Sequence, residues 1–394
     1  MYNQPHWDIY SLLFYLLLAM TGGVCSYYIY HHRTESSKMS RYLYYAIWFC
    51  SWEIAATFRR IGSFIGGADS LAYIRYFNNC LLGENYQVQS HFGADLMYRY
   101  INQLVRIFTN NYHVLFFIIY AILMLSYFFT LKNFNDKRYS CIPYFIIFYI
   151  YLRGFVTFRT NLSVAMILFS LCCWKNKRNK LAVVFAILSV FFQRASILYA
   201  VIILFLYLVE RKNVSIYKCI LGILAMAVLG RVGQYIVANY NIPFLEHGAY
   251  RYYILYANEG STFFDGFWKV ALPQILLLIL MFLFRKDIKM YEEKLSHDGK
   301  SYTFRLTKMI CYFDIMTIPA TFILHVWRGY EYLYIFRLIM WGALIEIISQ
   351  KFEERSRRIV KIFIWCLFIG WMAFRIYNTW EDSGLMPFSF DFSS

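Results

Sequence analysis

Residues 112–131 read YHVLFFIIYAILMLSYFFTL, an apolar stretch without a single charged side chain. A helix rises about 1.5 Å per residue, so this stretch covers about 30 Å, the thickness of a bilayer's hydrocarbon core. The segment therefore predicts a transmembrane helix. Comparable apolar runs predict spans near residues 9–30, 42–58, 112–131, 141–157, 160–174, 181–193, 195–209, 216–238, 267–284, 306–325, 334–350 and 359–377.

The composition fits the same fold class. Hydrophobic residues make up 60% of the chain and charged residues only 16%, below the roughly 25% of a soluble domain. We expect an all-α polytopic integral membrane protein, a bundle of about 12 transmembrane helices forming one domain over residues 1–394. Several runs are short. We therefore expect tight hairpins or partly re-entrant segments in two pairs of runs, 141–157 with 160–174, and 181–193 with 195–209. Residues 1–8 contain no Lys or Arg, which argues against a cleavable signal peptide.

The distribution of basic residues predicts the orientation. The net charge is +16, and 25 of the 39 Lys and Arg residues fall in one set of alternate loops. Basic loops stay in the cytoplasm, so both termini should face outward. Two larger outer loops follow, near 59–111 and 239–266, and amphipathic stretches in the first predict short interfacial helices. Because no basic soluble module exists, we expect no binding of nucleic acid.

The outer basic residues differ in kind from the cytoplasmic ones. Of the remaining 14, all are Arg except Lys269. Arg is favoured over Lys where a planar fork must hold phosphate or carboxylate, or stack on an aromatic ring. The outer face is therefore expected to bind an anion together with a polyol. The nine cysteines form no CxxC pair, so we expect no metal or redox cofactor.

Two segments of the first outer loop carry candidate site residues. RRIGSFIGGADSLAYIRYF (59–77) combines Arg60, Asp69, Tyr73 and Tyr76 with a glycine-rich turn, and it reads either as a phosphate clamp beside a carboxylate or as an ordinary helix cap. GADLMYRYIN (93–102) offers a second carboxylate or another capping Asp. Its candidates are Asp95 and Tyr98.

The remaining candidates stand at other outer span ends. YLRGFVTFRTNLSVAM (151–166) places Arg153 and Arg159 at a membrane face, where an Arg either snorkels to lipid headgroups or requires a partner or cavity. The tyrosines taken singly could form an interfacial aromatic belt, but Arg and Tyr interleave in several outer segments. These segments add Gln193, Arg194, Arg251, Arg328 and Tyr330.

Three acidic residues fall inside expected spans. They are Glu53, Asp314 and Glu346. Acids at such positions either form a proton or ion pathway or pair with basic groups of neighbouring helices.

Taken together, the outer motifs resemble those of the EpsG/Wzy-type polysaccharide polymerases of bacterial envelope assembly. The resemblance covers roughly residues 55–340. Gln193 stands where the family usually has His, so a His-based mechanism is not expected there, and the Pro-Gly that follows the second carboxylate is missing. The matching elements are Arg60, Gly66, Asp69, Tyr73 and Tyr76, then Asp95 to Tyr98, Arg159 in RTNLSVAM, Phe192 to Ser196, and Arg328 to Tyr334.

The resemblance implies a bacterial cytoplasmic-membrane enzyme that polymerises lipid-linked repeat units of O-antigen, capsule or exopolysaccharide on the outer face. It needs no cofactor. Its substrate would be an oligosaccharide on undecaprenyl pyrophosphate within membrane lipid, and a chain-length regulator and a flippase could be partners. On this reading Arg159 is catalytic, Asp69 or Asp95 is the base, and Arg60, Arg194 and Arg328 join Arg159 in holding pyrophosphate. The other expected substrate-binding residues are Arg153, Arg251, Gln193, Tyr73, Tyr76, Tyr98 and Tyr330.

Two classes of alternative remain at this stage. One is another multispan glycosyltransferase or an O-antigen ligase, although the outer loops lack the adjacent acidic pair that the former usually presents. The other is a transporter for the lipid-linked glycan, for which paired repeats and broken midplane helices would be typical.

Overall fold

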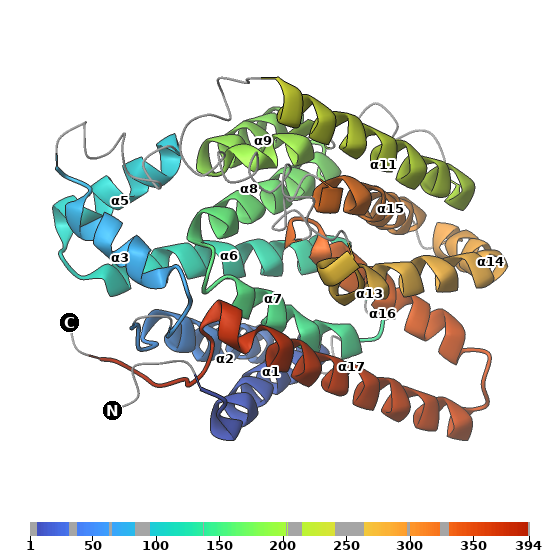
Figure 1. Cartoon of the computed structure of the whole chain (residues 1–394). Coiled ribbons are helices and arrows are strands. Elements are labelled where there is room, and N and C mark those ends of the chain that lie inside the picture. Colours follow the sequence, from blue (N-terminus) through green and yellow to red (C-terminus); the bar gives the residue numbers. More distant parts are fainter. Residues whose placement is uncertain are drawn as a thin grey trace.

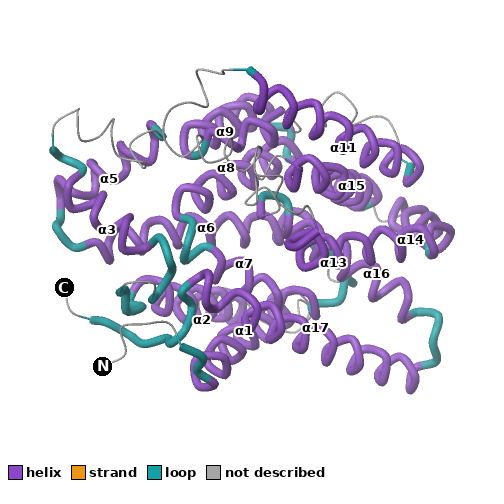
Figure 2. The backbone as a smooth tube through the Cα atoms, viewed as in Figure 1, coloured by secondary structure: helices purple, strands orange, loops and turns teal. Residues whose placement is uncertain are grey.

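The computed structural model describes residues 6–30, 38–62, 65–82, 95–136, 138–201, 203, 215–240, 264–297, 300–323 and 331–392. Regular secondary structure within these ranges is helical (Figure 2). The helices are α1 (Ile9–Tyr30), α2 (Lys38–Thr57), α3 (Ser70–Asn79), α5 (Leu96–Phe108), α6 (Tyr112–Phe134), η1 (Ile142–Ile146), α7 (Ile147–Arg153), α8 (Phe158–Lys175), α9 (Asn179–Phe192), η2 (Arg194–Ser196), α11 (Ile216–Asn239), α13 (Phe264–Leu283), α14 (Arg285–His297), α15 (Ser301–Ile323), α16 (Tyr334–Ser349) and α17 (Glu354–Ser383).

The helices agree closely with the apolar runs of the sequence. Within the described ranges, four are long and apolar enough to cross a membrane: α1, α6, α11 and most of α17. Shorter apolar helices cover 142–153, 179–192 and 272–283. Of the expected span at 195–209, the structure describes 195–201 and 203, so a total of twelve stays a prediction.

One expected span is shorter than the sequence suggested. The run at 141–157 begins as the 3-10 helix η1, which has Pro143 in its first turn, and continues as α7 only to Arg153. The remaining residues 154–157 form a turn before α8 starts. At about 2.0 Å per residue in a 3-10 helix and about 1.5 Å in an α-helix, the twelve residues of η1 and α7 cover about 20 Å, less than the roughly 30 Å of a bilayer core. A tight hairpin with α8 and a partly re-entrant segment both stay predictions.

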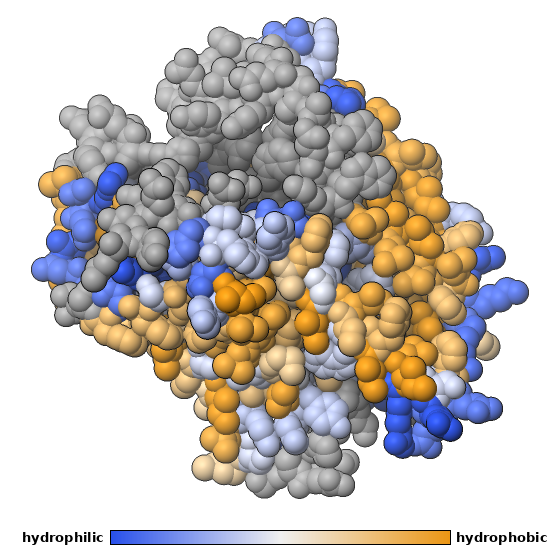
Figure 3. All heavy atoms as spheres, turned by 60° about the horizontal axis from the view of Figure 1, so that its bottom comes forward, coloured by the Kyte–Doolittle hydropathy of each residue, from blue (hydrophilic) through white to orange (hydrophobic). Residues whose placement is uncertain are grey.

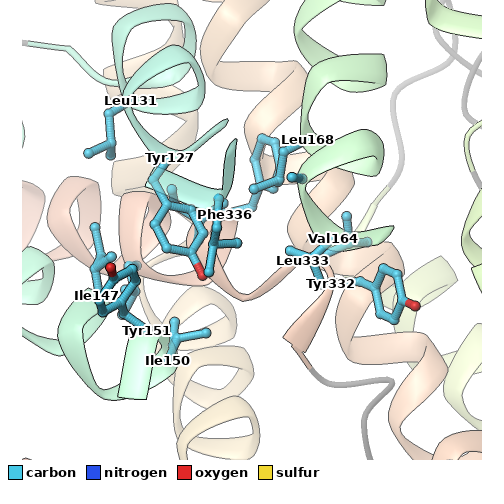
Figure 4. Close-up of a cluster of buried hydrophobic side chains, with 14 of the residues drawn as sticks. Tyr127, Leu131, Ile147, Ile150, Tyr151, Val164, Leu168, Tyr332, Leu333 and Phe336 are labelled. Atoms are coloured by element: carbon cyan, nitrogen blue, oxygen red, sulfur yellow. The ribbon is translucent and has the colours of Figure 1, made fainter. Parts of the chain in front are cut away.

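The packing around α8 forms the centre of the bundle (Figure 1). Almost every side chain of α8 is buried, between α6 on one side and α9 on the other. Figure 4 shows side chains of α6, α7, α8, the first turn of α16 and the residues just before it in one apolar cluster. Its labelled members are Tyr127, Leu131, Ile147, Ile150, Tyr151, Val164, Leu168, Tyr332, Leu333 and Phe336.

Both ends of the chain lie at the same end of the bundle (Figure 1). The C-terminal segment runs across the start of the chain, where the Phe388 backbone N–H donates to Ser11 Oγ at 2.7 Å. It also pairs with the first large loop, since the Arg60 N–H donates to the Ser389 carbonyl at 2.7 Å. We call the end that carries the termini and this loop the terminal face, and the other end the opposite face.

The surface is typical of a protein embedded in lipid. Figure 3 shows hydrophobic residues spread across the visible side, with hydrophilic groups gathered at its edges. Large apolar side chains such as Leu17, Leu221 and Ile362 are more than half exposed. Amphipathic α14 corresponds to none of the predicted helices and lies at the opposite face, where Glu292 pairs with Lys308 at 2.5 Å.

Candidate catalytic site

A buried ion pair lies at the start of α8. Arg159 Nη1 donates a hydrogen bond to Asp95 Oδ2, and the two residues are 5% and 2% exposed. Asp95 immediately precedes α5, so the pair joins the first large loop to a helix more than sixty residues further along the chain. A guanidinium charge buried this deeply is stable only beside a counter-charge, and the Asp95 carboxylate provides that counter-charge.

Arg194 approaches the same carboxylate from the end of α9. Burial raises the pKa of the Asp95 carboxyl above its usual range, while the Arg159 guanidinium and the Arg194 charge and backbone N–H oppose that rise. The group at this point therefore contains two guanidinium groups and one carboxylate. Neighbouring Gln193 is 6% exposed, and its Oε1 accepts no hydrogen bond within the described part of the chain.

Tyrosines of the two interfacial helices enclose Arg159. Tyr73, on α3, stacks on Phe158 with ring centroids 4.4 Å apart, and its hydroxyl faces the Arg159 guanidinium. Tyr98, on α5, packs edge-on against Tyr73 at 5.7 Å and lies 6.0 Å from the ring of Tyr76. All three tyrosines are at most 2% exposed. The three rings are therefore buried around the arginine, and their role in binding substrate stays a prediction.

The glycine-rich turn is held by Arg59, the neighbour of the predicted Arg60. Arg59 is 1% exposed, donates from Nε to the Gly66 carbonyl at 2.5 Å, and lies 4.3 Å from the Phe155 ring centroid. Gly66 has φ +74°, and a Cβ there would overlap the Arg60 carbonyl oxygen. The turn is thus tied to the segment that leads into α8.

A second set of polar groups lies beside the first. Arg153 Nε is 3.7 Å from Glu331 Oε1, and Glu331 is 5% exposed. The Tyr332 hydroxyl donates to Ser163 Oγ at 3.1 Å, one helical turn from Arg159. The start of α16 is therefore packed directly against the first turns of α8.

The predicted residues divide into three groups. The structure brings together Tyr73, Tyr76, Asp95, Tyr98, Arg159, Gln193 and Arg194, with Arg153 close by at the end of α7. Arg60 is exposed. Asp69 is half-buried at the N-cap position of α3, but its side chain makes no capping hydrogen bond, contrary to the interpretation of Asp69 as a helix cap. Arg251, Arg328 and Tyr330 lie outside the described residues.

Two residues of this region, Arg59 and Glu331, were not among the candidate site residues. Arg59 stands beside Arg60 in the same dipeptide, and only its packing shows which of the two faces inward. Glu331 lies in the Arg- and Tyr-rich stretch at 325–338, and it could have been found as the one acid there able to pair with a neighbouring arginine.

The acids within spans are mostly paired. Asp314 accepts two bonds from Arg337, of which the Nη2–Oδ1 distance is 3.0 Å, and both residues are at most 3% exposed. Glu346 is 2.9 Å from Lys361. Glu53 accepts from Thr57 at 3.1 Å. Pairing between helices, rather than a continuous ion path, accounts for the first two.

An apolar cavity of about 390 Å³ lies between α13, α16 and α17. Its lining on α16 runs from Tyr334 to Ile348, about 21 Å along the helix axis at 1.5 Å per residue. Arg337 also lines it. The cavity therefore begins two residues along the chain from Tyr332, which contacts α8.

These features define a helical membrane protein with a buried arginine–carboxylate cluster at one face. A family model described as the EpsG family matches residues 42–390, so the chain belongs to the EpsG family. That membership supports a role in polysaccharide polymerisation within a membrane. Searches of curated proteins and of solved structures found no match.

Proposed function

We propose that this protein polymerises lipid-linked oligosaccharide repeat units at the extracytoplasmic face of a bacterial cytoplasmic membrane. The growing glycan would leave undecaprenyl pyrophosphate and be attacked by a hydroxyl of a second lipid-linked unit. The bond between the anomeric carbon and the pyrophosphate oxygen breaks, and a glycosidic bond forms. The observation that carries the proposal is the Arg159–Asp95 pair, with Arg194 beside it, enclosed by tyrosines of two outer helices.

Charge stabilisation is the first requirement of this reaction. The departing pyrophosphate gains negative charge, and fixed guanidinium groups stabilise that charge without having to reorganise. Arg159 stands in the first turn of α8, where backbone N–H groups also favour an anion. Thr160 Oγ1 is buried there with no hydrogen-bond partner among the described residues. We assign Arg159 and Arg194 to the pyrophosphate.

A base for the attacking hydroxyl is the second requirement. Asp95 fits this role, because burial raises the pKa of its carboxyl toward the range in which a base accepts a proton readily. Asp69 is the other candidate, since it lies one turn before Tyr73 on α3. Asp95 is favoured because it contacts Arg159, which we place at the leaving group.

The lipid tail needs an apolar path within the membrane. The cavity between α13, α16 and α17 supplies one, since it runs for about 21 Å beside α16 and starts close to Tyr332 and the first turns of α8. We assign the polyprenyl chain to this cavity, with its phosphate end directed toward Arg337 and α8.

Sizing the surface polysaccharide of a deletion strain tests the function. With a polymerase missing, lipid-linked single repeats accumulate. A missing ligase would leave long polymer on the lipid carrier, and a missing transporter would leave single units on the inner leaflet. Unchanged long polymer at the cell surface contradicts every form of the proposal.

Arg159→Lys and Arg159→Ala, returned to the deletion strain, then test the site. We expect single-unit products from Arg159→Ala, and strongly shortened polymer from Arg159→Lys, because lysine keeps the charge but not the fork. Arg178→Ala is the matched control, since Arg178 is exposed at the opposite face. Normal polymer from both Arg159 variants removes Arg159 from the site.

A further inference from the structure

A second cavity opens at the opposite face, away from the candidate catalytic site. It has a volume of about 760 Å³ and lies between the end of α1, the start of α2 and the end of α6. Tyr45, Phe128 and Phe129 form part of its apolar wall. The Tyr45 ring packs edge-on against Phe128 at 5.1 Å, so this wall is built by neighbouring helices.

The mouth of this cavity is lined by hydrogen-bond donors. Arg41 and Lys132 bring two positive charges, and the described residues that line the cavity include no Asp or Glu. Arg41 Nε and Asn135 Nδ2 are buried and donate no hydrogen bond within the described part of the chain. The nearby acid Asp136 is already paired with Arg138 at 2.9 Å and with Lys300 at 2.7 Å. Among the described residues, these two donors at the mouth therefore have no acceptor.

The depth of the cavity matches one leaflet of a bilayer. Its lining on α2 runs from Arg41 to Cys50, nine residues or about 14 Å along the axis. Half of a bilayer core is about 15 Å. A ligand held here would have its charged part at the membrane boundary and an apolar chain extending toward the midplane.

We infer that this cavity binds an anionic glycerophospholipid of the leaflet at the opposite face, with the headgroup phosphate on Arg41, Lys132 and Asn135 and an acyl chain against Phe128 and Phe129. Phosphate oxygens supply the acceptors that the donors lack, and an acyl chain has the length of a leaflet. This binding is independent of the proposed reaction, whose cluster lies at the terminal face.

Native mass spectrometry of the purified full-length chain tests the inference. The probes are phosphatidylglycerol and phosphatidylcholine with identical acyl chains. The wild-type chain should retain phosphatidylglycerol more tightly, because its headgroup is anionic. The double variant Arg41→Gln/Lys132→Gln should lower its affinity for phosphatidylglycerol about tenfold or more, since each basic residue near a membrane surface contributes on the order of 1 kcal/mol.

Two further variants show whether the lipid lies in this cavity. Arg178→Gln/Lys180→Gln removes the same charges from exposed positions at the same face and should leave phosphatidylglycerol retention unchanged. Ala46→Trp keeps both charges but fills the cavity, and it should reduce retention of phosphatidylglycerol. An equal loss in the Arg178/Lys180 control, or wild-type retention in Ala46→Trp, overturns the inference. Size-exclusion profiles identify any variant that fails to fold.

Discussion

Single and double variants of Asp95 and Arg159 can separate the contribution of this ion pair to stability from its proposed role in catalysis. Both residues are at least 95% buried, so solvent screens neither charge. Asp95→Asn leaves the guanidinium buried without its counter-charge. Removing one partner of such a pair costs about 3–5 kcal/mol, and we expect the free energy of unfolding to fall by that amount.

The double variant Asp95→Asn/Arg159→Gln removes one charge of each sign and keeps polar side chains, although glutamine is shorter than arginine. Because the net charge of the cluster is then unchanged and only the half-buried Arg194 stays charged, we expect most of the lost stability to return, to within about 1–2 kcal/mol of wild type. Polymer formation should not return, since both the proposed base and the guanidinium are gone. Restored stability without restored activity would therefore distinguish the chemical role from the structural one.

The assay is denaturant unfolding of the purified chain in detergent, together with polymer sizing in the complemented deletion strain. Arg358→Gln is the control, because Arg358 pairs with Glu354 at 2.6 Å on the surface, where such pairs contribute little. Long polymer from the double variant would refute the catalytic assignment. Wild-type stability of Asp95→Asn would refute the ion-pair reasoning.

Three other outcomes follow from the same structure. Gly66→Ala should lower the free energy of unfolding by more than about 1 kcal/mol, because φ is +74° and the new Cβ would overlap backbone atoms. Gly370→Ala is the control, since its Cβ would meet nothing within 4 Å and should not destabilise the protein. Thermal unfolding of the two variants compares these effects. If Asp95 is the base, polymerisation by purified enzyme should decline on acidification. Because burial raises the pKa of Asp95, the decline should begin at higher pH than the ordinary aspartate value of about 4 implies, as a pH–rate profile would show. Arg337→Gln should lower the free energy of unfolding by about 3–5 kcal/mol, and Asp314→Asn in the same chain should recover most of it.

The positions of the spans could be predicted from the sequence because membrane thickness sets a length that an apolar run must reach. The runs at 9–30, 112–131 and 216–238 agree with their helices to within a few residues. The run at 141–157 did not, since hydropathy does not register that it divides into the 3-10 helix η1, the short helix α7 and a turn. The amphipathic pattern likewise predicted α3 and α5, whereas α14 lies in a basic stretch for which no helix was predicted.

The types of residue in the candidate site could be predicted from the sequence, but their arrangement in space could not. An outer excess of Arg over Lys indicates anion chemistry wherever the arginines lie. Tertiary packing alone decides that Arg59, and not Arg60, is buried in the turn, and that Asp95 meets Arg159 across sixty-four residues. Gln193 is a further example. The sequence places it beside Arg194, but only the structure shows that its Oε1 is buried.

The charge balance of this cluster bears directly on substrate binding. Two guanidinium groups and one carboxylate leave an excess positive charge in a largely buried setting, which is costly unless an anion completes it. In the proposed reaction, pyrophosphate would supply that negative charge, so binding of the lipid-linked donor would relieve an existing electrostatic cost as well as add contacts. Breaking the glycosyl–phosphate bond would place still more negative charge on the same oxygens, and the guanidinium groups would then interact more strongly with the transition state than with the bound donor. An interaction that strengthens along the reaction in this way raises the rate of the chemical step as well as the affinity for substrate.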